Sequence, residues 1–139
     1  MKINWLILLI IFHISFCKAI TFGDKQIIII LNQYFEKSNS TQLLGHHFFS
    51  DKNDTVFQIE IETETENFNI AMVDAFRVIN KLSNIAKTKF TQSIVIVHFR
   101  TNNLPIIAKS ELGCSKEFFI YKTHNEALWR QNCLSIQKN

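Results

Sequence analysis

The strongest constraint on this 139-residue chain is a strand pattern, a long helical pattern and a second strand pattern in direct succession. In residues 55–64 (TVFQIEIETE) Phe57, Ile59 and Ile61 alternate with polar side chains, which predicts a half-buried strand with one wet face. Residues 93–100 (SIVIVHFR) are apolar on both faces, which is typical of a strand in the middle of a sheet. Two strands joined through a helix in this way run parallel, with a right-handed crossover.

Two helices are predicted from apolar spacing. The crossover helix spans about residues 66–87, and Thr63 and Glu66 have the spacing of a capping box at its start. Residues 24–37 (DKQIIIILNQYFEK) form a second apolar stripe with Asp24 as its cap, although four consecutive isoleucines also favour a strand. The stripe of the crossover helix consists of Phe68, Met72, Ala75, Phe76, Ile79, Leu82 and Ala86.

A hairpin follows the central strand and completes the predicted sheet. Residues 101–103 (TNN) form a turn, and residues 104–110 (LPIIAKS) return as an antiparallel strand that Pro105 places at an edge. The sheet is therefore mixed. Because one face of its first strand carries polar side chains, we expect helices to cover only the other face. We predict an α+β fold, a two-layer sandwich with a βαββ core.

Two segments are less regular. Residues 38–54 are polar and contain Gly45, so we expect a long connection with at most a short extended piece at 43–44 or 47–49. The tail after Leu112 is either two short helices or a strand at 118–122 followed by a helix, for which Asn125 is a suitable cap.

The first 19 residues (MKINWLILLIIFHISFCKA) have the pattern of a secretory signal peptide. Lys2 precedes an apolar run over residues 3–16, and Cys17 and Ala19 are small residues at the −3 and −1 positions of a cleavage site. The run is shorter than the ~20 residues of a spanning helix, which disfavours a retained anchor. Lipid attachment at Cys17 is the other alternative, disfavoured by the bulky Phe16 before it.

Cleavage after Ala19 leaves residues 20–139 as one domain of ordinary size. Loss of Lys2 and Lys18 leaves 13 basic and 12 acidic residues, so the net charge of +3 falls to +1. No basic patch remains that could follow a nucleic-acid backbone, and we expect no nucleic-acid partner and no membrane insertion of the mature chain.

Cys114 and Cys133 are then the remaining cysteines, and an even pair in an oxidising compartment predicts a disulfide. A zinc site would need four ligands, and only His124 lies between the two cysteines. A catalytic thiol would leave the second cysteine without a role.

No local motif for catalysis, a metal or a cofactor is present. Glu60, Glu62, Glu64 and Glu66 form an acidic strip that we interpret as a solvated sheet face. His46 and His47 are adjacent, so on an extended segment they point apart and do not share one metal. His98 is expected to be a partly buried, hydrogen-bonded side chain.

The tail that the predicted disulfide closes carries four aromatic residues, and such side chains are enriched at interface hot spots. We predict a binding surface there, with core packing of the same residues as the alternative: Phe118, Phe119, Tyr121 and Trp129. Asn39-Ser40-Thr41 and Asn53-Asp54-Thr55 are glycosylation acceptor patterns, which have meaning only in a eukaryotic secretory pathway.

The sequence thus predicts a small exported binding protein, periplasmic or secreted, whose partner is another protein. An envelope-complex subunit and a periplasmic inhibitor or immunity protein are examples of this class. The alternative is a small secreted hydrolase or effector that uses His98, His124 or the histidine pair with carboxylates of the acidic strip. A pocket joining a histidine to Glu60 or Glu62 would favour that enzyme.

Overall fold

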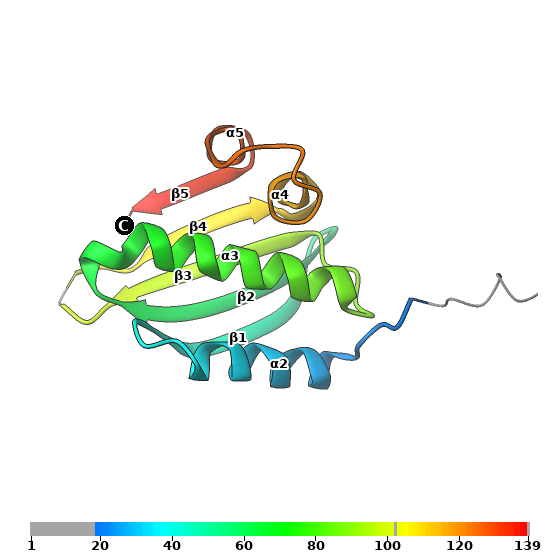
Figure 1. Ribbon diagram of the computed structural model, residues 1–139, viewed down its shortest axis with the longest axis horizontal. Coiled ribbons are helices and arrows are strands. Elements are labelled where there is room, and N and C mark those ends of the chain that lie inside the picture. Colours follow the sequence, from blue (N-terminus) through cyan, green and yellow to red (C-terminus); the bar gives the residue numbers. More distant parts are fainter. Residues whose placement is uncertain (1–18, 102, 139) are drawn as a thin grey trace, which may run out of the picture.

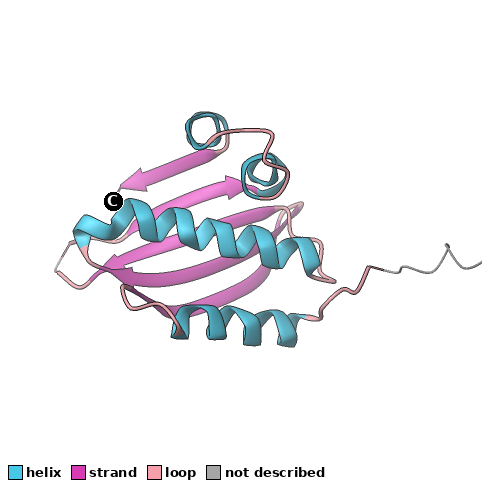
Figure 2. Cartoon of the chain, viewed as in Figure 1, coloured by secondary structure: helices cyan, strands magenta, loops and turns pink. Residues whose placement is uncertain are grey.

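The computed structural model describes residues 19–101 and 103–138, and it has the predicted two-layer α+β architecture with a mixed sheet. Figure 1 shows the helices gathered over one face of the sheet, with α3 lying across its middle, and Figure 2 separates the helices from the strands. The elements are α2 (Asp24–Glu36), β1 (Thr41–Asp51), β2 (Asp54–Thr63), the 3-10 turn η1 (Thr65–Asn67), α3 (Phe68–Ile85), β3 (Gln92–Phe99), β4 (Ile106–Glu111), α4 (Leu112–Phe119), α5 (Glu126–Asn132) and β5 (Leu134–Lys138).

The sheet has the order β1-β2-β3-β4-β5, so β3 is central as its two apolar faces predict. β2 and β3 are parallel and joined through α3, whereas the other neighbouring strands are antiparallel. The edge position predicted for β4 is wrong, because β5 pairs along its other side. Pro105 precedes β4, so the missing N–H does not interrupt the ladder.

The segment expected to be a long connection contains β1, an 11-residue strand. It pairs with β2 from Thr41 opposite Thr63 to Asp51 opposite Asp54, and a register shift between Leu43 and Gly45 marks a β-bulge. The bulge moves one residue out of alternation, which explains why no period of two is visible in this sequence.

The helices begin differently from the predicted caps. α2 starts at Gly23, whose N–H donates to Gln26 Oε1 at 2.8 Å, while Asp24 lies inside the first turn and accepts from Thr88 Oγ1 at 2.7 Å. Thr63 is fully buried in β2 and donates to the carbonyl of Ser40, so the predicted capping box does not form. η1 leads into α3 instead.

The core lies between the helices and one face of the sheet. α3 buries the largest share, and α2 adds Ile27, Leu31 and Phe35 from its own stripe. These side chains pack on residues of β2 and β3 that alternate with the polar positions of each strand: Phe57, Ile59, Ile61, Val95 and Val97. The two strands therefore have one buried face and one face without a helix.

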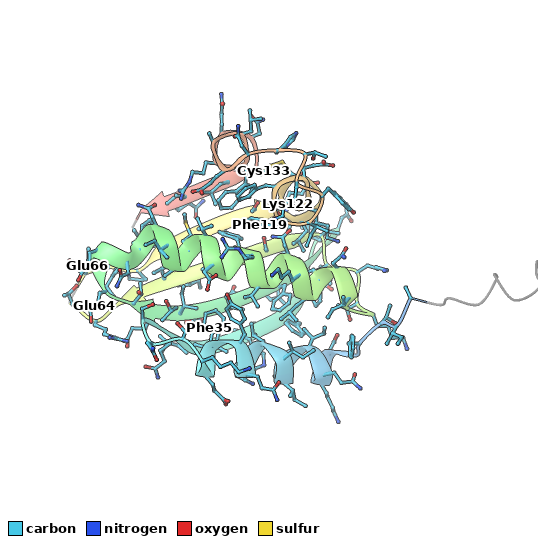
Figure 3. All side chains as sticks on the ribbon, in the orientation of Figure 1. Phe35, Glu64, Glu66, Phe119, Lys122 and Cys133 are labelled. Carbon is cyan, nitrogen blue, oxygen red and sulfur yellow. A yellow bond between two sulfur atoms is a disulfide. The ribbon has the colours of Figure 1, made fainter. Side chains whose placement is uncertain are left out.

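The tail forms two short helices, the first of the two predicted alternatives, and then adds β5. The predicted disulfide is present, with the Cα atoms of Cys114 and Cys133 separated by 5.6 Å. It ties the first turn of α4 to the residue that ends α5 and precedes β5, and Figure 3 labels Cys133 in this corner of the molecule.

The signal-peptide prediction concerns residues 1–19, of which all but Ala19 lie outside the described residues. Across residues 19–101 and 103–138, none of the helices is both long and apolar enough to cross a bilayer.

Candidate functional site

The aromatic residues of the tail divide between the core and the surface. Trp129 is 0% exposed and Phe119 2%, whereas Tyr121 is 59% exposed and Phe118 is partly buried. The expected display of all four on one surface is therefore corrected, because Phe119 and Trp129 are core residues. A contact through Phe118 and Tyr121 remains a prediction.

Trp129 is the centre around which the tail packs. Its ring centroid lies 4.9 Å from that of Phe119, 5.8 Å from that of Phe118 and 5.5 Å from that of Phe76 on α3. Its indole N–H donates to Ser110 Oγ at 3.4 Å, a long bond that supplies the partner a buried indole needs. The tail aromatics thus join α4 and α5 to the core.

The sheet face opposite the helices carries a different apolar group. Ile94 and Ile96 project from β3 on this open face, and Ile107 of β4 lies directly beside Ile96. We call Ile94, Ile96 and Ile107 the isoleucine strip. All three side chains are partly exposed, and they are the outward counterparts of the buried Val95, Val97 and Ala108.

Polar residues surround the isoleucine strip in the pairing register. Gln58 and Glu60 of β2 lie beside Ile94 and Ile96, while Lys109 of β4 lies on the other side of Ile94. Gln137 of β5 pairs with Ile107. An apolar centre inside a polar rim is the arrangement of a protein–protein contact surface.

The β2 side of this rim is a row of paired charges. His98 Nε2 lies 3.1 Å from Glu60 Oε2, and the Arg100 guanidinium lies 3.7 Å from Glu62 and 3.1 Å from Glu64. In the acidic strip, Glu60, Glu62 and Glu64 are therefore partly buried beside His98 and Arg100, whereas Glu66 is exposed. The predicted partly buried, hydrogen-bonded His98 is confirmed.

The remaining histidines do not converge. His46 lies opposite the buried Ile59, whereas His47 lies opposite Gln58 and is exposed, so the two point to different faces. The buried Nδ1 of His124 has no hydrogen-bond partner among the described residues. Within this part of the chain, no group of three or more His, Cys, Asp or Glu side chains is placed to hold a metal ion.

Three hollows lie away from the isoleucine strip. One of about 470 Å³ lies between the end of α2 and the start of β1, with Arg100 in its lining. A second, of about 270 Å³, lies between α3 and α5 and is lined in part by Arg130. A third, of about 600 Å³, lies at the start of α2 and is lined in part by Lys87. None of the three is lined by His98 or Glu60.

No protein-family model matches this chain, and comparisons with curated proteins and with solved structures gave no significant match.

Proposed function

We propose that this protein is a small exported binding protein that recognises another protein through the open face of its sheet. The observation that carries the proposal is the isoleucine strip, partly exposed at the centre of a sheet face without a helix. A solvated sheet face normally carries polar residues at such positions, and grouped apolar side chains with a polar rim mark interaction surfaces.

Export is the second part of the proposal. The disulfide between Cys114 and Cys133 is typical of oxidising compartments, and the first 19 residues have the composition of a signal peptide. A periplasmic or secreted location satisfies both features. A subunit of an envelope complex and an inhibitor of an exported protein remain the kinds of role that fit.

The contacts of the acidic side chains beside the isoleucine strip support recognition of a partner. His98 lies within 4 Å of Glu60, and the Arg100 guanidinium lies within 4 Å of Glu62 and Glu64. These contacts hold the three carboxylates in place before a partner arrives. Such exposed pairs add only about 0–1 kcal/mol each to folding. At an interface they favour partners with complementary charge and slow the approach of others.

The test is capture of the native partner by variants with one changed side chain. Ile96→Lys places a positive charge in the isoleucine strip. Glu60 lies beside this position and can pair with the new lysine, so the fold should persist. Ile29→Lys is the matched control, because Ile29 is 55% exposed on α2. We expect Ile96→Lys to weaken partner binding at least about tenfold, equivalent to about 1.4 kcal/mol, with an unchanged melting curve.

Partner binding that survives Ile96→Lys would contradict the assignment of the open face. If Tyr121→Ala weakens partner binding instead, the contact lies on the tail, as the sequence predicted. Equal loss in the Ile29→Lys control would show that any added charge on the surface has the same effect.

A second candidate function rests on the contact between His98 and Glu60. A carboxylate that orients an imidazole is half of a general-base arrangement, which fits a small secreted hydrolase. Replacing His98 and His124 together by Gln should leave biological function largely intact if the protein is a binder. Complete loss of function with an unchanged melting curve would support the hydrolase.

A further inference from the structure

The two glycosylation acceptor patterns both lie in exposed turns. Asn39 is exposed in the bend between α2 and β1, and Asn53 is exposed in the turn of the β1–β2 hairpin. A glycan is bulky and must project into solvent, so an exposed turn of an exported chain is the setting in which this pattern is used.

We propose that Asn39 and Asn53 carry N-linked oligosaccharides, and that the two glycans protect the free edge of β1 from pairing with other chains. This inference rests on the export proposed above and further requires a secretory pathway with an oligosaccharyltransferase. The co-substrate is an oligosaccharide linked to a lipid pyrophosphate.

The transfer forms one bond and breaks one. The side-chain Nδ2 of the asparagine bonds to the anomeric carbon of the oligosaccharide, and the bond from that carbon to the pyrophosphate oxygen breaks. One amide proton passes to a base of the transferase, and the lipid pyrophosphate leaves. No oxidant or reductant takes part.

β1 is an edge strand of the described sheet, because β2 is its one hydrogen-bonded neighbour among residues 19–101 and 103–138. At 11 residues it spans about 35 Å, roughly twice the length of an ordinary strand. Its sequence, TQLLGHHFFSD, contains no Lys, Arg or Pro, and Leu44 and Phe49 are 47% and 40% exposed. A long edge strand with exposed apolar side chains and without lysine or proline is a site of intermolecular strand pairing.

The opposite edge of the sheet is protected by its shortness. β5 has only five residues and so presents a short edge. β1 has only the bulge between Leu43 and Gly45. Protection from outside the strand is therefore needed at β1 and not at β5.

The acceptor asparagines flank β1. Asn39 precedes its first residue by two positions, and Asn53 follows its last residue by two. Figure 1 shows the α2–β1 turn and the β1–β2 hairpin at opposite ends of this strand. Glycans at these positions would hinder the approach of a second strand from either end.

The burial of Thr41 sets the order of events. The transferase recognises the hydroxyl group at the third position of the pattern, and Thr41 is only 7% exposed after β1 has paired with β2. Asn39 is thus modified before the sheet forms, as the chain enters the secretory pathway.

The first experiment is a mass spectrum of the native protein before and after enzymatic release of N-glycans. We expect loss of two oligosaccharides, with Asn39 and Asn53 converted to Asp. In a glycosylating secretory host, the full chain with Thr41→Ser keeps both glycans, whereas the similarly sized Thr41→Val keeps only the one at Asn53. An unmodified Asn39 or Asn53 in the native protein overturns the inference, and an N-terminus at Ile20 in the same spectrum would leave export intact.

The second experiment tests the protective role by analytical ultracentrifugation. The glycosylated protein should remain monomeric, and the enzymatically deglycosylated protein should self-associate as its concentration rises. Leu44→Lys should restore the monomer without glycans, whereas Ile96→Lys, on the sheet face and not the edge, should not. A deglycosylated chain that stays monomeric at every concentration overturns this role.

Discussion

Asn80 is fully buried on α3, and both polar atoms of its amide are paired. Its Nδ2 donates to the carbonyl of Phe76 at 2.8 Å, and its Oδ1 accepts from Ser115 Oγ of α4 at 3.0 Å. Ser115→Ala leaves that oxygen buried and unpaired. We expect the free energy of unfolding, measured in urea, to fall by about 1–3 kcal/mol.

Ser83→Ala is the matched control for this prediction. Ser83 is 6% exposed on the same helix, but its hydroxyl has no hydrogen-bond partner among the described residues. Removing an unpaired buried hydroxyl removes a desolvation cost, so stability should stay constant or rise. Equal losses in the two variants would contradict the role of the Asn80–Ser115 hydrogen bond.

Tyr34 links α2 to α3 through a hydrogen bond in which its hydroxyl donates to Asp74 Oδ2 at 2.7 Å. Burial, followed by the hydrogen bond and the negative charge of Asp74, raises the pKa of the phenol to about 12. An unfolded tyrosine titrates near pH 10, so the folded state favours the neutral phenol. The resulting stabilisation is complete below pH 10 and is lost as the pH rises through 12.

The measurement is an alkaline titration of phenolate absorbance in wild type and Tyr34→Phe. The chain has only two tyrosines, so the difference between the two curves isolates Tyr34. We expect the wild type to show a step in phenolate absorbance near pH 12 that Tyr34→Phe lacks. The variant should also lose less of its free energy of unfolding between pH 10 and 12. A Tyr34 step near pH 10 in the folded protein would be the contrary result.

At the scale of elements, the predictable parts of the fold were those with local periodicity. β2, α3 and β3 each bury a face whose residues recur at the period of a strand or a helix, and their order alone implies the parallel crossover. β1 and β5 were missed. β1 loses its alternation at the bulge, and the five residues of β5 form a strand only because β4 is available for pairing.

The candidate site was predictable only in part. The sequence predicted a partly buried, hydrogen-bonded His98, but its contact with Glu60, 38 positions away, depends on the register of β2 and β3. Trp129 was predicted to lie on a binding surface because aromatic side chains are grouped in the tail, with core packing as the alternative. Its burial comes from Phe76 of α3, a contact that no local pattern reports.

The disulfide links α4 to the end of α5, and its removal should affect those elements first. It joins cysteines 19 positions apart, for which the chain-entropy model gives about 3 kcal/mol. Replacing both Cys114 and Cys133 by Ser should lower the free energy of unfolding by about 2–4 kcal/mol. Hydrogen exchange should quicken in α4, α5 and β5 while the centre of α3 stays protected.

Reduced wild-type protein is the control for the double variant, because it lacks the same bond but keeps both sulfur atoms. The two should unfold at the same urea concentration. Protection in the tail equal to that of the oxidised wild type would mean that Trp129 and its neighbours hold α4 and α5 without the bond.

At the scale of the whole molecule, the described chain contacts the end of α3 just after the predicted cleavage site. Among the described residues, Phe22 is the first with tertiary backbone hydrogen bonds: its N–H donates to the carbonyl of Ile85 at 2.8 Å, and its own carbonyl accepts from Lys87 at 2.7 Å. The side chain packs against the core. Cleavage after Ala19 therefore leaves this bridge to the end of α3 complete.

We expect a chain that begins at Ile20 to fold with a cooperative urea transition. A chain that begins at Gly23 lacks both hydrogen bonds and the Phe22 side chain, and should lose about 2–4 kcal/mol relative to it. Phe22→Ala in the longer chain is the control, because it keeps the two backbone bonds and should give an intermediate loss. If the chains beginning at Ile20 and Gly23 unfold alike, the bridge does not define the start of the domain. If mass spectrometry of the native protein finds Met1 or a lipid on Cys17 instead of Ile20 at the N-terminus, the proposed processing is wrong.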